Sequence, residues 1–104
     1  MDDSVKNTLS QEYLKGGENY LSKKLLVSAI KQISLLIEQG SNSKNFPDTE
    51  LLNISQNFLQ LYREEGDDHY LEISKICRKV AHRVYRVLLK KHLVKKNNKF
   101  LNLV

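Results

Sequence analysis

The chain has 104 residues and a net charge of +5, and this length fits one domain built around one apolar core. A single cysteine excludes an internal disulfide framework and a cysteine-based zinc site. No apolar run reaches the roughly 18 residues of a membrane span, and the first residues lack the pattern of a secretory leader, so we expect an intracellular protein, cytoplasmic or nuclear.

The N-terminal segment predicts one short helix over residues 9–15. Thr8 or Ser10 is suited to cap this helix at its start. Gly16 and Gly17 follow directly and are expected to end it. We expect its apolar side chains to dock on the rest of the fold: Leu9, Tyr13 and Leu14.

The first long helix is predicted over residues 19–39, because apolar side chains recur there with helical period. Gly40 is expected to end it as a left-handed C-cap. The polar side chains fall on the opposite half of the helical wheel. The predicted buried stripe consists of Leu21, Leu25, Leu26, Ala29, Ile30, Ile33, Leu36 and Ile37.

A second helix is predicted from Asp48 to near Gly66, after a polar loop and Pro47. The carboxylate of Asp48 is suited to accept the free amide hydrogens at the start of this helix. Its predicted buried side chains are Leu51, Leu52, Ile54, Phe58, Leu59, Leu61 and Tyr62.

The third helix has the strongest pattern, with Asp67 and Asp68 at its start and a Lys/Arg excess toward its end, as the helix dipole favours. Its apolar arc consists of Ile73, Ile76, Cys77, Val80, Ala81, Val84, Val87 and Leu88. The opposite arc is what we call the basic stripe: Lys75, Arg78, Lys79, His82, Arg83, Arg86 and Lys90.

These patterns predict an all-α fold, a small helical bundle of three main amphipathic helices plus a short N-terminal helix. Short connections favour an up-down-up order of the main helices. We expect an N-terminal segment at residues 1–18, a bundle domain at 19–96 and a C-terminal tail at 97–104. The tail is apolar, and we rank docking on the bundle or a piece of a longer protein above engagement of a partner.

Catalytic and metal-binding chemistry have little support in the residues. Cys77 lies on the apolar arc of the third helix, so we interpret it as a core residue and not as a nucleophile. The three histidines, His69, His82 and His92, have no ligand partner at the i, i+4 spacing of a helical zinc site. We therefore expect no catalytic residue, no metal and no cofactor, and we predict that the chain is not an enzyme.

The basic stripe is the main functional signal, because its charges are uncompensated. Glu72 is the last acidic residue, and residues 73–104 contain ten Lys or Arg and no Asp or Glu. An ordinary solvated helix face mixes both signs at i, i+4, since like charges at that spacing are destabilising. The stripe therefore favours binding of anions.

The leading hypothesis is a non-catalytic protein-interaction module, an adaptor-like domain that binds an acidic or phosphorylated partner segment through the basic stripe. The alternative is weak, sequence-independent binding of nucleic acid through the same helix, although the acidic start of that helix disfavours base readout. A membrane-surface role ranks last, because the core needs the apolar arc of the third helix.

Overall fold

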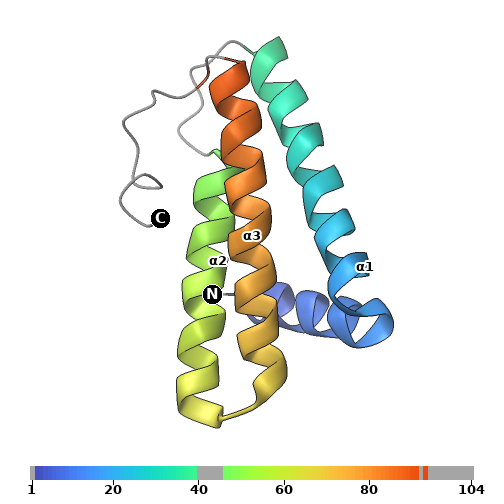
Figure 1. The fold of residues 1–104 in the computed structure, drawn as a ribbon, viewed down its shortest axis with the longest axis vertical. Helices are drawn as coiled ribbons and strands as arrows, with labels where there is room; N and C mark the ends of the chain where they lie inside the picture. The colour runs from blue at the N-terminus through green and yellow to red at the C-terminus, as the bar shows by residue number, and fades with distance from the viewer. Residues whose placement is uncertain (1, 40–45, 92, 94–104) are drawn as a thin grey trace.

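The computed structural model describes residues 2–39, 46–91 and 93. Within these residues it has three α-helices and no strand: α1 (Asp3–Glu38), α2 (Pro47–Glu65) and α3 (Asp68–Lys90). Figure 1 shows α2 and α3 as an antiparallel pair, with the second part of α1 running parallel to α3. The predicted all-α bundle of three main helices is confirmed. Gly40 and the predicted C-terminal tail lie outside the described residues.

α1 changes direction sharply at Gly17 (Figure 1). Gly17 has φ 77° and ψ −163°, a backbone region that is essentially restricted to glycine. Gly16 is needed beside it for a second reason, because a Cβ atom there would collide with the side chain of Tyr20. The two glycines therefore set the bend of α1.

The expected short N-terminal helix is not confirmed as a fourth element, because one helix, α1, spans the kink at Gly17. Its residues belong to the first part of α1, which we call the N-terminal arm (residues 3–16). The arm is capped by Asp2 and not by Thr8 or Ser10, since the Asp2 carboxylate accepts a hydrogen bond from the Ser4 backbone at 2.8 Å. Gly17 has non-helical backbone angles, so the helix is interrupted at the glycines and the second part of α1 begins beyond them.

Contacts on both sides of the bend hold the N-terminal arm in place. Leu9 is buried in the core. The Lys6 ammonium lies 3.8 Å from the Glu65 carboxylate of α2. Across the bend, the Lys24 ammonium lies 3.3 Å from the carboxylate of Glu12. The hydrogen bond from Tyr20, together with Lys24, lowers the pKa of Glu12 below its usual range.

The turn between α2 and α3 follows the predicted capping. Gly66 ends α2 in the left-handed conformation, with φ 73°. Asp67 then caps α3, and its carboxylate accepts a hydrogen bond from the His69 backbone at 3.2 Å. The start of α2 differs from the prediction. Its N-cap is Phe46, Pro47 takes the first turn with its fixed φ, and Asp48 is buried inside the helix.

α2 and α3 approach closely at a reciprocal pair of buried serines. The Ser55 hydroxyl donates to the Ser74 carbonyl oxygen at 2.8 Å, and the Ser74 hydroxyl donates to the Ser55 carbonyl oxygen at 2.7 Å. The two hydroxyl oxygens are 3.0 Å apart. Two small side chains let the backbones come together, and their hydrogen bonds satisfy the buried hydroxyls.

The core is built mainly on α3, which supplies the largest share of its buried side chains. The predicted apolar arc of α3 is confirmed, with Val87 only half-buried. The stripe of α1 is corrected at two positions, because Ile30 and Ile37 are exposed. α1 packs against α3 far more than against α2, so its covered sector is narrower than half of the helical wheel.

Candidate functional site

α3 displays the basic stripe because its opposite arc is held in the core. The side chains of Arg83 and Arg86 are exposed, while their neighbours Val84 and Tyr85 are buried. Lys75, Arg78, Lys79 and Lys90 are also exposed, and His82 is half-buried. The orientation expected from the helical wheel is therefore present for the whole stripe.

Part of the basic stripe forms one wall of a groove between α1 and α3. This α1/α3 groove encloses about 420 Å³, within the usual range of ligand sites. It brings four stripe residues together and leaves Lys75, Arg78 and Lys90 outside its lining. The lining residues are Glu18, Asn19, Ser22, Lys79, Val80, His82, Arg83 and Arg86.

The other wall comes from α1 and was not predicted from the sequence. Glu18, Asn19 and Ser22 follow the bend at Gly17 directly, and the direction of the helix after that bend places them beside α3. The sequence signal that could have indicated this wall was the polar character of these three side chains around the start of the helix predicted over residues 19–39. A wheel drawn for each helix alone does not tell which faces of two helices meet.

The stripe is partly compensated by acidic side chains at its beginning. The Lys75 ammonium lies 3.7 Å from the Glu72 carboxylate, and the Lys79 ammonium lies 3.2 Å from the Glu18 carboxylate. Both pairs are exposed, and such pairs contribute little to stability. Among the described residues, no Asp or Glu forms an ion pair with Arg83 or Arg86. Within the groove lining, Lys79 is paired with Glu18, whereas Arg83 and Arg86 have no acidic partner among the described residues.

His82 lies within the groove wall beside these charges. Partial burial lowers its pKa below the ordinary value of 6.5, and the nearby Arg78 and Arg86 lower it further. At neutral pH the imidazole is therefore mostly uncharged, and one of its nitrogens is a neutral hydrogen-bond donor. The arginines supply the charge at this wall.

Cys77 is a core residue, as the sequence predicted. Its side chain is fully buried, and burial raises the pKa of the thiol to about 12. A thiol with such a pKa carries almost no thiolate at neutral pH. Nucleophilic chemistry at Cys77 is therefore disfavoured.

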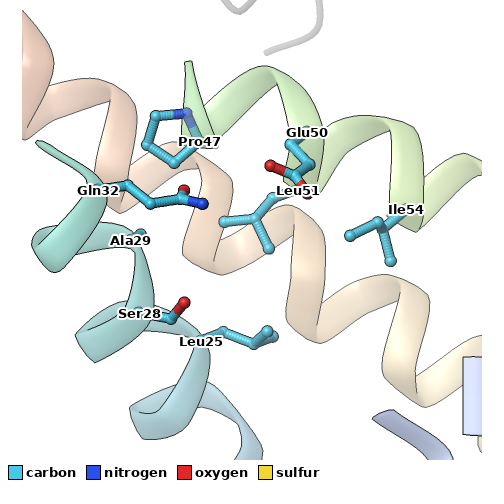
Figure 2. Close-up of a pocket in the computed structure, with 8 residues that line it drawn as sticks. All are labelled: Leu25, Ser28, Ala29, Gln32, Pro47, Glu50, Leu51 and Ile54. Carbon is cyan, nitrogen blue, oxygen red and sulfur yellow. The ribbon is translucent and has the colours of Figure 1, made fainter. Parts of the chain in front are cut away.

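A second hollow lies between α1 and α2, where side chains of both helices point into the space between them (Figure 2). It encloses about 90 Å³, which is small beside ordinary ligand sites. Glu50 is the only charged residue in its lining. The α1/α3 groove is therefore a better candidate site than this hollow. The lining of the hollow is Leu25, Ser28, Ala29, Gln32, Pro47, Glu50, Leu51 and Ile54.

Other kinds of site and relationship have no support. Among residues 2–39, 46–91 and 93, no three His, Cys, Asp or Glu side chains gather as metal ligands would. No helix in the described part of the chain combines the length and apolar character needed to cross a bilayer. Comparisons with protein families, curated proteins and solved structures gave no match for this chain.

Proposed function

We propose that the chain is a non-catalytic interaction module that binds an acidic or phosphorylated segment of a partner protein at the basic face of α3. One observation carries this proposal. Arg83 and Arg86 lie exposed on the wall of the α1/α3 groove, and within the described residues neither has an acidic partner. Two uncompensated guanidinium groups at a concave surface favour an anion that fits between the helices.

The donors of the groove match the chemistry of carboxylate and phosphate groups. A guanidinium holds either group in bidentate geometry. Asn19 and Ser22 on the opposite wall add neutral donors, so an anion in the groove would meet hydrogen-bond donors from both helices. The lysines of the stripe add to the positive field around it without fixing the geometry.

Nucleic acid is the alternative ligand, since the same cations would neutralise phosphates. Glu18 on the α1 wall and Asp67, Asp68 and Glu72 at the start of α3 disfavour it, because they would repel a phosphate backbone that follows the helix. A short acidic segment contacts fewer groups and avoids most of these carboxylates. The groove therefore favours a protein segment.

The first experiment reverses the charge of the groove. The double variant Arg83→Glu and Arg86→Glu should keep the fold, because both side chains are exposed. Binding of a glutamate-rich peptide and of a phosphoserine peptide should fall by at least about tenfold in calorimetric titrations. Lys23→Glu with Lys31→Glu is the matched control, since it changes the net charge equally on exposed positions of α1 that do not line the groove.

Equal losses in the two double variants would contradict a site at the groove. Conservative Arg83→Lys and Arg86→Lys changes separate the ligand classes. A protein segment held by bidentate contacts should bind more weakly to these variants. Duplex DNA should bind about equally well, with affinity falling with salt at a slope of about −0.9 per neutralised phosphate. Tighter binding of duplex DNA than of both peptides would favour the alternative.

A further inference from the structure

α1 exposes an apolar row along the edge that borders the α1/α3 groove. Ile30 is 46% exposed and Ile37 is 51% exposed, although both belong to the helical stripe that was expected to be buried. At 100° per residue, Asn19, Ile30 and Ile37 fall within about 20° of one another on the helical wheel. Since Asn19 lines the groove, the two isoleucines continue the same edge of α1.

α3 carries a cationic row that begins at the opposite wall of the groove. Arg83, Arg86 and Lys90 are exposed and follow one another at i, i+3 and i+7, so they stack along one side of the helix. The second part of α1 and α3 run in the same direction (Figure 1). Both rows therefore extend from the groove toward the same end of the bundle.

Together, the apolar row on α1 and the cationic row on α3 favour one kind of partner segment. Exposed isoleucines on a row favour contact with apolar side chains of a partner. A purely acidic chain or a single phosphate would leave them uncovered, and a purely apolar helix would leave the arginines facing no opposite charge. An amphipathic helix with Asp or Glu along one flank of its apolar stripe complements both rows.

We infer that the partner segment is an acidic amphipathic helix, whose apolar side chains contact Ile30 and Ile37 while its carboxylates pair with Arg83, Arg86 and Lys90. This inference rests on the proposed function and names the ligand of that site. The helix lies along the groove and extends toward the C-terminal ends of α1 and α3. Apolar side chains of the partner helix at positions i, i+3 or i+4, and i+7 would reach Ile30 and Ile37 on α1.

The experiment uses two synthetic peptides of identical composition. The first, of about 14 residues, carries leucines at i, i+4 and i+7 with glutamates on one flank, and the second is a scrambled isomer without an apolar face. Binding to the full chain is measured by fluorescence anisotropy at one low salt concentration. The amphipathic peptide should bind at least about tenfold more tightly than its isomer.

The double variant Ile30→Ser and Ile37→Ser should reduce the affinity for the amphipathic peptide to that for the scrambled isomer. Val27→Ser with Leu35→Ser is the matched control. These side chains are 45% and 52% exposed, and on the wheel they lie about 60° and about 140° from Ile30. The control variant should bind the amphipathic peptide as the unmodified chain does, and circular dichroism should show that both variants fold.

The outcomes separate this inference from the proposed function. If both peptides bind equally and the Ile variant has no effect, while Arg83→Glu with Arg86→Glu abolishes binding, the amphipathic ligand is wrong and the proposed function stands. If the Arg variant leaves the binding of both peptides unchanged, the proposed function fails and this inference fails with it. An equal loss in the Ile variant and its control would also overturn the inference.

Discussion

The α2/α3 hairpin and the second part of α1 differ in how completely they bury their apolar side chains. In the hairpin, Phe58, Ile73 and Val84 have no exposed surface, and the Ser55 and Ser74 hydroxyls satisfy each other's carbonyls. In α1, four large apolar side chains remain about half exposed after the bend: Val27, Ile30, Leu35 and Ile37.

The buried face of the hairpin supplies most of the packing, and the exposed surface along α1 is where we propose that a partner binds. The hairpin is closed by short-range capping at Gly66 and Asp67 and by packing along both helices, so its apolar side chains are used within the fold. α1 packs mainly against α3 and less against α2, and it keeps exposed apolar side chains after the bend. The buried face of the hairpin is therefore the scaffold, and we propose that the edge of α1 and the basic stripe of α3 together form the binding surface.

The largest expected effect comes from one substitution made in both regions. Val84→Asp in the hairpin should lower the free energy of unfolding by roughly 3–5 kcal/mol or prevent folding, because it buries an unpaired carboxylate. Val27→Asp in α1 should cost less than about 1 kcal/mol, since Lys23 and Lys31 lie one turn away on either side. Urea denaturation measures both values. Similar losses at the two positions would contradict the division between scaffold and surface.

A smaller effect is expected at the two glycines with positive φ. Asn tolerates the left-handed conformation of Gly66 but not the φ 77°, ψ −163° of Gly17. Gly17→Asn should therefore lower the free energy of unfolding by about 1–3 kcal/mol, and Gly66→Asn by less than about 1 kcal/mol. Thermal and urea denaturation would show the order. A larger loss at Gly66 would mean that the bend of α1 is not backbone-constrained.

Serine hydroxyls give a third contrast between the regions. Ser55→Ala or Ser74→Ala should cost about 1 kcal/mol each, because each removes a buried hydrogen bond. Ser34→Ala in α1 should be neutral or slightly stabilising, since the Ser34 hydroxyl donates to the Ile30 carbonyl at an exposed position. In a double-mutant cycle, Ser55 and Ser74 should couple by at least about 0.5 kcal/mol. Additive losses would show that the two hydroxyls act independently.

The sequence was most informative where a local signal and an apolar pattern agreed. In α3, the acidic start after Gly66 and the arc from Ile73 to Leu88 predicted the start of the helix and its buried face. At the start of α2, the capping side chain of Asp48 and the fixed φ of Pro47 indicated different first residues for the helix. Pro47 has the fixed φ of a first helical residue, so the helix begins there and Asp48 falls inside it.

Features that depend on two distant segments were not predictable in the same way. Gly16 and Gly17 indicated a break, but the new direction of α1 follows from the docking of Leu9 and from contacts such as Lys6 with Glu65. The α1 wall of the groove depends on that direction. Helical periodicity also assigned Ile30 and Ile37 to the buried stripe, although both are exposed. Periodicity does not show how wide a sector of α1 is covered by the neighbouring helices.

The smallest expected effect concerns His82, on the side of α3 that faces α1. Burial and the neighbouring arginines lower its pKa in the folded chain, so near and below the ordinary value of 6.5 the unfolded chain binds more protons at this residue. Its contribution to stability is present above that value and is lost as the pH falls through the folded pKa. The charged groups around it are Arg78, Lys79, Arg83 and Arg86 on α3 and Glu18 on α1.

The variant His82→Asn removes this titration and keeps a neutral polar side chain. Between about pH 7.5 and about pH 5, the melting temperature of the unmodified chain should fall more than that of the variant. Scanning calorimetry at several pH values measures the difference, and circular dichroism confirms that the variant folds. A bound acidic peptide would favour protonated His82, so peptide at saturating concentration should reduce the acid sensitivity of the unmodified chain more than that of the variant. An identical pH dependence in the two chains would show that His82 does not sense the charges of the groove.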